Sequence, residues 1–430
     1  MVESDYGSGF HARGTTWMLG GSIIGAITAY LFQVLVGNAL GEEEFAPTSI
    51  QWTVLFLVLT IVFVPLEQWA TRQAAHGRDV MRTNLPVTLT VGIGAAVAVA
   101  LVLVALRNTF FDGRLVFAVQ IAVSLVLYGF MFVAKGQVAG MRRFGAVGTI
   151  LAVEGTARLI VALALVAVDA SAPLVGWSFI AGPLAFLLIR PRRPEAASLV
   201  HDSGAEPAAR FLGSYVLASG ASQVLLGGAP VVVGLLGAPN AIVSVVFVTF
   251  TLYRAPLTLL YAVQGRLLSA FLRSVDSGAQ RSLRTFGAAL GALGLALVAA
   301  GWWVGVKLGP SVVQLLYEEG FTPGADVAGM VAGGVVAATF AQVGGQVIIA
   351  QGRPMRLGAA WASGLTVGGL VLLAGSRETP ELAVSWAFFV GELTAFCVVT
   401  LLVLITNRPG GRWSLPPPDD QAFGAAPSTM

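Results

Sequence analysis

Long apolar runs alternate with short polar stretches along the whole chain. Runs of about 18 or more apolar residues are typical of membrane-spanning helices. They are continuous rather than alternating in polarity, which favours helices over the strands of a membrane barrel. We predict an all-α polytopic membrane protein of about 12 transmembrane helices. The predicted spans lie at roughly 16–38, 47–70, 86–106, 114–134, 145–168, 172–189, 211–236, 241–263, 286–306, 327–350, 357–374 and 382–406.

The basic residues predict the orientation of these spans. With the N-terminus in the cytoplasm, 19 of the 25 lysines and arginines lie in inner segments and 4 lie in outer ones. This distribution follows the positive-inside rule. It predicts that both termini of this multi-pass protein are cytoplasmic. The excess of arginine (23) over lysine (2) is typical of a GC-rich bacterial genome, so the expected location is a bacterial cytoplasmic (inner) membrane. The net charge of +3 therefore needs no nucleic-acid partner to explain it.

A polar, proline-containing segment divides the chain into two halves. PRRPEAASLVHDSGAEPAA (191–209) follows the sixth span. We predict a six-helix N-terminal lobe (1–195), a cytoplasmic linker (196–209), a six-helix C-terminal lobe (210–408) and a disordered cytoplasmic tail (409–430).

The two halves show a weak internal repeat. VPLEQWATR (64–72) resembles APLTLLYAVQGR (255–266), and KGQVAGMRRFGAVG (135–148) resembles GGQVIIAQGRPMRLGAA (344–360). Two six-span halves that enter from the same side would be parallel repeats. Chance similarity between apolar segments is the alternative. Pro65 and Pro256 occupy matching places in this repeat, and we predict a hinge at each.

Five charged residues lie inside predicted spans, where each costs at least ~2.5–3.5 kcal/mol unless it faces protein or water. They are Glu67, Glu154, Glu392, Arg158 and Arg254. Arg254 is too deep in its span to reach the surface easily and is followed by Pro256. It either caps carbonyls that the proline frees or binds a phosphate group.

The remaining charged residues also allow two readings each. Glu154 and Arg158 are spaced i,i+4 and therefore lie on one helix face. One interpretation is an internal ion pair that has only a structural role. In the other, Arg158 faces a lumen, where an anionic substrate replaces Glu154 as its partner or Glu154 takes up a proton. Glu67 is either a solvated interfacial acid or a site residue. Glu392 lies mid-span and is a candidate proton or cation carrier, or a partner for an arginine.

Several glutamines also fall within spans. Each can join helices by a hydrogen bond worth about 1 kcal/mol, but together they favour a polar lumen. They are Gln33, Gln120, Gln223, Gln342 and Gln346.

Motifs of enzymes and metal sites are missing from the sequence. It contains no G-x-x-x-x-G-K-[ST], no H-E-x-x-H and no G-x-S-x-G. Its single cysteine, Cys397, and three scattered histidines form no metal-binding pattern. We predict a carrier that is not an enzyme and needs no cofactor or metal.

Three segments resemble a known family. VGNALGEEEFAPTSIQWTVLFLVLTIVFVPLEQWATRQAAHGRD (36–79) is similar to the start of bacterial polysaccharide flippases of the Wzx type. These belong to the multidrug/oligosaccharidyl-lipid/polysaccharide (MOP) exporter superfamily. GQVAGMRRFGAV (136–147) and TLYRAPLTLLYAVQGRLLSAFLR (251–273) resemble later segments of the same family. The sequence LEQWATR replaces the family's usual D-x-G after the second span, so the resemblance does not assign a role to Glu67.

The resemblance implies two six-helix lobes arranged as a V with alternating access. It implies a cationic lumen for a polyprenyl-pyrophosphate-linked glycan, with one arginine from each lobe, Arg158 and Arg254. Membrane lipids and glycan-assembly enzymes would be its partners.

Three other functions compete with this reading. A cation- or proton-coupled multidrug exporter of the same fold would use Glu154 and Glu392. A membrane-embedded polysaccharide polymerase or ligase would need a sizeable outer loop. A membrane scaffold that transports nothing would not need its buried arginines for glycan export.

Overall fold

The structure is a computed structural model that describes residues 5–83, 85–188, 208–375 and 379–406. All secondary structure in these residues is helical. Nine of the described helical segments are long and apolar enough to cross a membrane. The first of them, Thr16–Ala75, contains two predicted spans. The prediction of an all-α, multi-pass membrane protein is confirmed.

Glycine and proline shape the first two spans. Helix α1 (Asp5–Val58) bends sharply at Gly41, whose backbone angles are φ 73° and ψ 168°, a conformation that glycine adopts readily. A π-helical stretch, η1 (Leu59–Phe63), then leads into α2 (Val64–Ala75). Pro65 lies in the first turn of α2 and has no N–H to donate to the preceding turn, which accounts for the irregular helix before it.

The rest of the N-terminal lobe contains three long helices and several short ones. They are α3 (Val80–Thr83), α4 (Leu85–Ala105), α5 (Arg107–Phe110), α6 (Val116–Gly140), α7 (Phe144–Val166), α8 (Ala172–Val175), α9 (Ser178–Ala181) and η2 (Pro183–Leu188). The predicted span at 172–189 is therefore broken into three short pieces. Pro183 is the first residue of η2 and has no backbone N–H to donate, which accounts for the break after α9. Pro173 lies in the first turn of α8, where a helix tolerates proline.

The C-terminal lobe contains the remaining helices. They are α10 (Ala208–Gly227), α11 (Ala229–Leu235), α12 (Asn240–Tyr253), α13 (Ala255–Asp276), α14 (Gln280–Leu316), η3 (Glu319–Phe321), α15 (Ala325–Ala350), α16 (Pro354–Ala374) and α17 (Pro380–Thr406). Helix α14 continues through Pro310 to Leu316. The connection between the predicted spans 286–306 and 327–350 is therefore partly helical, and the segment outside α14 begins only after Leu316.

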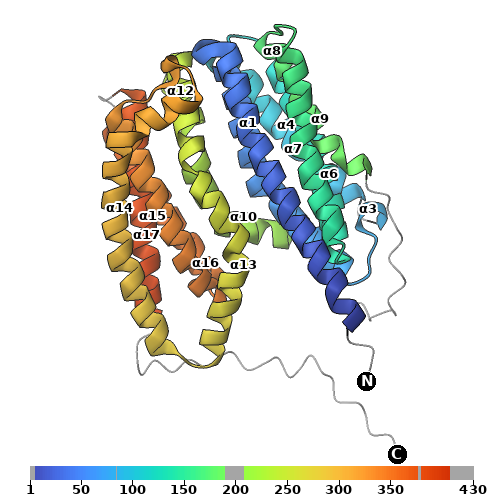
Figure 1. The fold of residues 1–430 in the computed structure, drawn as a ribbon, viewed down its shortest axis with the longest axis vertical. Helices are drawn as coiled ribbons and strands as arrows, with labels where there is room; N and C mark the ends of the chain where they lie inside the picture. The colour runs from blue at the N-terminus through green and yellow to red at the C-terminus, as the bar shows by residue number, and fades with distance from the viewer. Residues whose placement is uncertain (1–4, 84, 189–207, 376–378, 407–430) are drawn as a thin grey trace, which may run out of the picture.

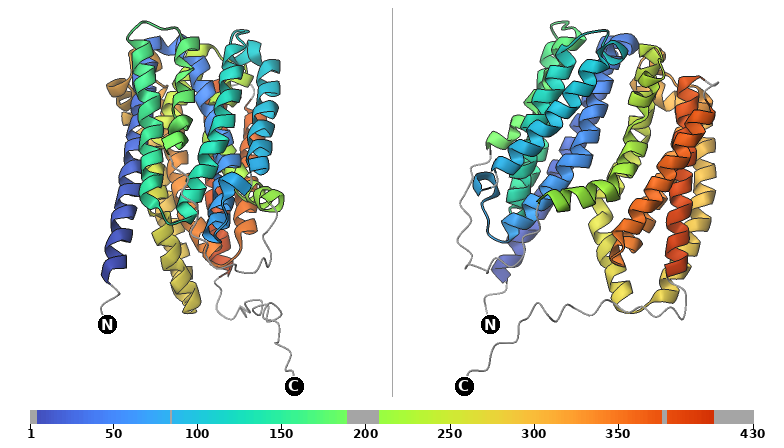
Figure 2. Two further views of the ribbon diagram at one scale, coloured as in Figure 1. Left: turned by 90° about the vertical axis from the view of Figure 1, so that its right-hand side faces the viewer. Right: turned by 180° about the vertical axis from the view of Figure 1, so that it is seen from behind.

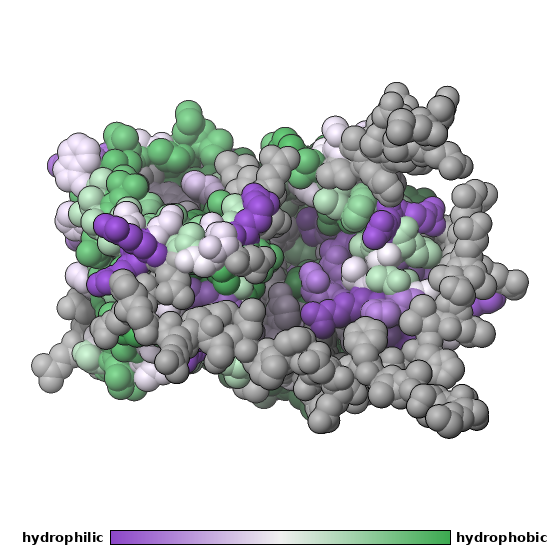
Figure 3. Space-filling view, turned by 90° about the horizontal axis from the view of Figure 1, so that it is seen from below, coloured by the Kyte–Doolittle hydropathy of each residue, from purple (hydrophilic) through white to green (hydrophobic). Residues whose placement is uncertain are grey.

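The two lobes meet at one end and separate towards the other (Figures 1 and 2). At the joined end, near the bend of α1, Asn38 Nδ2 donates a hydrogen bond to the Leu316 carbonyl at 2.8 Å. There the ring of Phe45 packs on Phe247, with centroids 5.7 Å apart, and on Phe321 at 6.0 Å. Seen from the other end, the surface is hollowed between the lobes (Figure 3). The residues of the predicted linker up to 207 and the tail (409–430) lie outside the described residues.

The segments of the proposed repeat occupy matching places in the two lobes. Pro65 and Pro256 lie in the first turns of α2 and α13. The turns that follow α6 and α15 each contain one left-handed residue, Arg142 (φ 56°) and Gly352 (φ 69°). Of these two turns, only the one in the N-terminal lobe places a side chain in this strained conformation.

We predict that Arg142→Gly stabilises the protein. A left-handed conformation costs a non-glycine residue roughly 1–2 kcal/mol, and glycine's greater freedom in the unfolded chain cancels part of this gain. The expected increase in the free energy of unfolding is about 1 kcal/mol, measured in detergent. The adjacent Met141 has φ −77° and is the control. Met141→Gly should destabilise the protein, and equal effects of both changes would contradict the prediction.

Candidate substrate cavity between the lobes

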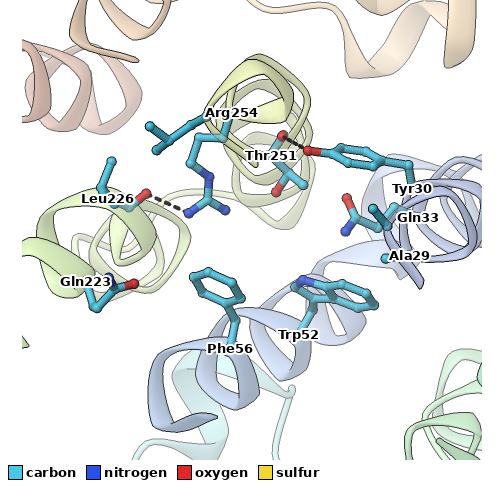
Figure 4. Close-up of a pocket in the computed structure, with 11 residues that line it drawn as sticks. Ala29, Tyr30, Gln33, Trp52, Phe56, Gln223, Leu226, Thr251 and Arg254 are labelled. Atoms are coloured by element: carbon cyan, nitrogen blue, oxygen red, sulfur yellow. Dashed lines mark hydrogen bonds between the residues drawn. The ribbon is translucent and has the colours of Figure 1, made fainter. Parts of the chain in front are cut away.

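A cavity of about 160 Å³ lies between the two lobes (Figure 4). Helix α1 lines one side, and α10, α12 and the start of α13 line the other. The Tyr30 hydroxyl donates to the Thr251 carbonyl across the gap at 3.4 Å. Trp52 and Phe56 form an aromatic wall. Of the described residues that line the cavity, only Arg254 carries a full charge.

Arg254 occupies the break between α12 and α13. Its Nη1 donates to the Leu226 carbonyl at 2.8 Å and its Nε donates to the Phe250 carbonyl at 3.1 Å. The guanidinium carbon lies 5.3 Å from the centre of the Phe56 ring. The side chain is half-buried and reaches towards α10 (Figure 4).

The sequence explains why these carbonyls need donors. In a continuous helix the Leu226 carbonyl would accept from residue 230, but that residue is proline and has no N–H. The Phe250 carbonyl would accept from the backbone of Arg254, whose N–H instead bonds to Leu252. Arg254 therefore makes the capping contacts that one reading of the sequence predicts. The proline responsible is Pro230, on a neighbouring helix, rather than Pro256.

Arg158 lies outside the cavity lining, inside the N-terminal lobe. Its Nη1 donates to Glu154 Oε1 at 2.8 Å and to the Tyr128 hydroxyl at 3.3 Å, and that hydroxyl donates to the same carboxylate oxygen at 2.8 Å. The guanidinium carbon lies 4.6 Å from the centre of the Trp52 ring. Trp52 belongs to the cavity wall, so the structure does not bring Arg158 and Arg254 together in one lining.

Glu67 has a partner that the sequence analysis missed. Its carboxylate lies 2.9 Å from Lys135 Nζ, which is also 4.2 Å from the centre of the Phe132 ring. The predicted fourth span ends at residue 134, which leaves Lys135 in a connection. In the structure α6 continues to Gly140, so Lys135 is a buried helical residue facing α2.

Glu392 is completely buried on α17, and no residue that the structure describes forms a hydrogen bond with either of its carboxyl oxygens. It is not among the described residues that line the cavity. An ionised carboxylate without a partner is very costly in an apolar interior. We therefore expect Glu392 to carry a proton in this conformation.

The five predicted glutamines do not share one site. Gln33 and Gln223 line the cavity, whereas Gln342 and Gln346 lie on α15 outside its described lining. Gln120 is buried and donates to the Pro173 carbonyl at 2.6 Å. Sequence reasoning missed Gln51, which donates to the Gly176 carbonyl at 3.2 Å. Gln51 and Gln120 thus hold the irregular α8–α9 region against the lobe.

No family model matches the chain. Uncharacterized protein Rv1510 of Mycobacterium tuberculosis is 30% identical over 283 residues, which cover 62% of this chain and 62% of that protein. Uncharacterized protein Rv3630 of the same organism is 29% identical over 273 residues, 60% of each chain. The chain therefore spans less than two thirds of the length of these relatives.

Solved structures of transporters share the fold. A MOP superfamily transporter from Pyrococcus furiosus has a TM-score of 0.61 at 14% identity, with 92% of this chain and 96% of that chain covered. For that transporter, reverse polarity of the binding pocket suggests a different function. The MATE transporter VcmN of Vibrio cholerae in its bent form has a TM-score of 0.53 at 15% identity, covering 92% and 98%. An inward-facing multidrug resistance MATE family transporter has a TM-score of 0.58 at 13% identity, covering 87% and 94%.

The chain therefore has the same fold as these MATE and MOP transporters. This confirms the fold that the sequence resemblance implied. The Wzx-type specificity remains a prediction.

The capping role of Arg254 can be measured by a double-mutant cycle with Pro230. Arg254→Ala leaves two carbonyls without their donor, and we expect it to lower the free energy of unfolding by about 3 kcal/mol. In a Pro230→Ala background the new backbone N–H can bond to the Leu226 carbonyl, so the same change should cost about 1 kcal/mol less. Pro239→Ala, in the connection before α12, is the control background. An unchanged cost in the Pro230→Ala background would show that Arg254 does not compensate for this proline.

The Arg158 cluster yields a second stability prediction. Glu154→Ala leaves a buried guanidinium without its counter-charge and should destabilise the protein by about 3 kcal/mol. Replacing both residues, as Glu154→Ala with Arg158→Met, should cost less than the single change because no unpaired charge remains. Free energies of unfolding in detergent test this. A double variant less stable than Glu154→Ala would contradict it.

Proposed function

We propose that the protein is a flippase that moves a polyprenyl-(pyro)phosphate-linked oligosaccharide across the bacterial cytoplasmic membrane for cell-surface polysaccharide assembly. The observation that carries this proposal is the charge of the cavity between the lobes. Arg254 contributes a permanent positive charge there, and no acid is among the described lining residues. Phosphate groups cannot cross hydrocarbon unaided, and guanidinium is well suited to bind them.

The neutral walls of the cavity also suit this cargo. Gln33 and Gln223 offer amide donors and acceptors, and Trp52 and Phe56 offer flat apolar faces. Ligand sites typically combine such apolar walls with a few polar groups that fix orientation. The cavity is small, so the phosphates would occupy it while the glycan extended into the hollow between the lobes (Figure 3). The prenyl tail would remain in the bilayer.

The arrangement of the lobes supports transport by alternating access. The lobes touch near the bend of α1 and leave the opposite end hollowed. In the predicted orientation, this conformation is open to the cytoplasm. We propose that rocking of the lobes exposes Arg254 to the other side and that the helix breaks at Pro65 and Pro256 bend as they rock.

A cation- or proton-coupled multidrug exporter is the second candidate, because Glu392 is a buried acid that has no hydrogen-bond partner among the described residues. A protonatable acid can couple either cargo to a proton gradient, so Glu392 alone does not choose between them. The sign of the cavity does favour one cargo. A cationic drug would meet the positive Arg254 with no described acid beside it, which is unfavourable, whereas an anionic headgroup would be attracted.

A change of charge inside the cavity distinguishes these two cargoes. Gln33→Glu is nearly isosteric and places a negative charge in the cavity that Arg254 lines. For an anionic cargo we expect transport to fall about ten-fold, equivalent to about 1.4 kcal/mol. For a cationic drug we expect transport to rise. The measurement is the accumulation of lipid-linked glycan on the cytoplasmic side of a deletion strain complemented with each variant, together with its drug resistance.

Gln342→Glu is the matched control, because it adds the same charge on α15 outside the described cavity lining. It should leave glycan export close to the wild-type level. Full glycan export by Gln33→Glu, combined with increased drug resistance, would overturn the flippase proposal. Normal export in the deletion strain itself would overturn it as well.

A further inference from the structure

A second cavity, of about 240 Å³, lies on the flank of the N-terminal lobe. It is formed by α3, the end of α6, the residue that precedes α7, and η2. Helix α3 lies on the side of this lobe that faces away from the C-terminal lobe (Figures 1 and 2). The cavity is therefore separate from the one that contains Arg254, and it faces the surroundings of the protein rather than the space between the lobes.

Two arginines from different segments line this cavity. Arg82 belongs to α3, and Arg143 is the residue directly before α7. Gln137 holds α3 against α6, because its Oε1 accepts the Met81 N–H at 2.8 Å and its Nε2 donates to Asp79 Oδ1 at 3.1 Å. This pair of hydrogen bonds fixes the segment that carries Arg82. No acid is among the described residues that line the cavity.

Arg143 contains a buried donor that is unused within the described part of the chain. Its Nη1 is inaccessible to solvent, and no described residue accepts a hydrogen bond from it. A buried donor without a partner costs about 1–3 kcal/mol, and more when the group is charged. Native proteins seldom leave such groups unsatisfied unless a ligand or another partner completes them. The missing partner should be an anion, because the guanidinium carries a positive charge.

The remaining wall of the cavity is apolar. Met81, Val138 and Phe186 contribute to it, together with Leu187. Leu187 is 66% exposed and the adjacent Leu188 is 63% exposed. Exposed leucines on a membrane-spanning lobe face lipid, so the apolar wall is continuous with the surface that lipid chains cover. A ligand here would have a charged head beside the arginines and an apolar tail along η2.

We propose that this cavity binds the phosphate headgroup of an anionic membrane phospholipid. Arg143 and Arg82 hold the phosphate, and an acyl chain lies against Phe186 and Leu187. The lipid belongs to the leaflet on the side of the chain's basic connections, where cationic side chains attract anionic headgroups. The site does not depend on the proposed flippase function, because the lipid is a bound component of the lobe rather than the cargo.

The test is native mass spectrometry of the purified full chain in detergent with added lipid. Three probes are compared, namely phosphatidylglycerol, phosphatidylcholine and inorganic phosphate. We expect the wild type to retain phosphatidylglycerol in preference to phosphatidylcholine, and we expect inorganic phosphate not to displace it. Arg143→Gln should weaken the binding of phosphatidylglycerol about ten-fold, the effect of losing one strong charged hydrogen-bonding group.

Arg142→Gln is the matched control. It removes the same charge from the adjacent residue, which is exposed and is not among the described lining residues. It should change phosphatidylglycerol binding less than about two-fold, as expected of a solvent-exposed charge. Equal weakening by both variants would mean that the basic surface attracts lipid without a site. Unchanged binding by Arg143→Gln would also overturn the proposal.

Two further results decide between possible ligands and guard against misfolding. Displacement of the lipid by inorganic phosphate would show an anion site with no lipid preference, and it would overturn the assignment to a phospholipid. Arg82→Gln is the second variant, because its side chain is exposed and its loss should not disturb folding. It should also weaken phosphatidylglycerol binding, and wild-type binding by this variant would contradict the role given to Arg82.

Discussion

Every backbone carbonyl of this protein that lies within the bilayer needs a hydrogen-bond donor from the protein or from water in a cavity. Proline removes such donors, and the chain places Pro230 and Pro256 in two adjacent helix breaks of the C-terminal lobe. Arg254 supplies donors to the Leu226 and Phe250 carbonyls at these breaks. The same residue that allows α10 and α12 to be interrupted therefore brings a positive charge to the cavity between the lobes.

The groups that contact each buried charged side chain determine whether its charge is available to a ligand. Arg158 and Lys135 are paired with glutamates at 2.8 and 2.9 Å, so their net charge is cancelled within the N-terminal lobe. The side chain of Arg254 instead bonds to two backbone carbonyl groups, which hold it at the helix break. It is the one fully charged residue in the described lining of the cavity. The position of Arg254 in this lining, rather than the number of acids and arginines in the spans, gives the described lining its positive charge.

Much of the fold could be predicted from the sequence because its determinants are local. Continuous apolar runs require helices in lipid, and Gly41, Pro65 and Pro256 lie at irregularities that depend on their own backbone chemistry. The i,i+4 spacing of Glu154 and Arg158 also places them on one helix face, where the structure shows them in contact. The ends of helices were less predictable. Lys135 extends α6 beyond its apolar run because Glu67 on α2 compensates its charge.

The sequence by itself determined a multi-pass helical protein with a few charges buried in its spans. The reason is that a bilayer requires long runs of apolar residues whose backbone groups are hydrogen-bonded within a helix. Only the tertiary structure decided which of these charges meet. Pro230 and Arg254 are far apart in the sequence, and nothing local shows that one frees a carbonyl that the other caps. Likewise, Trp52 separates Arg158 from the cavity that Arg254 lines. These relations depend on how helices pack, which is a property of pairs of distant residues rather than of any single segment.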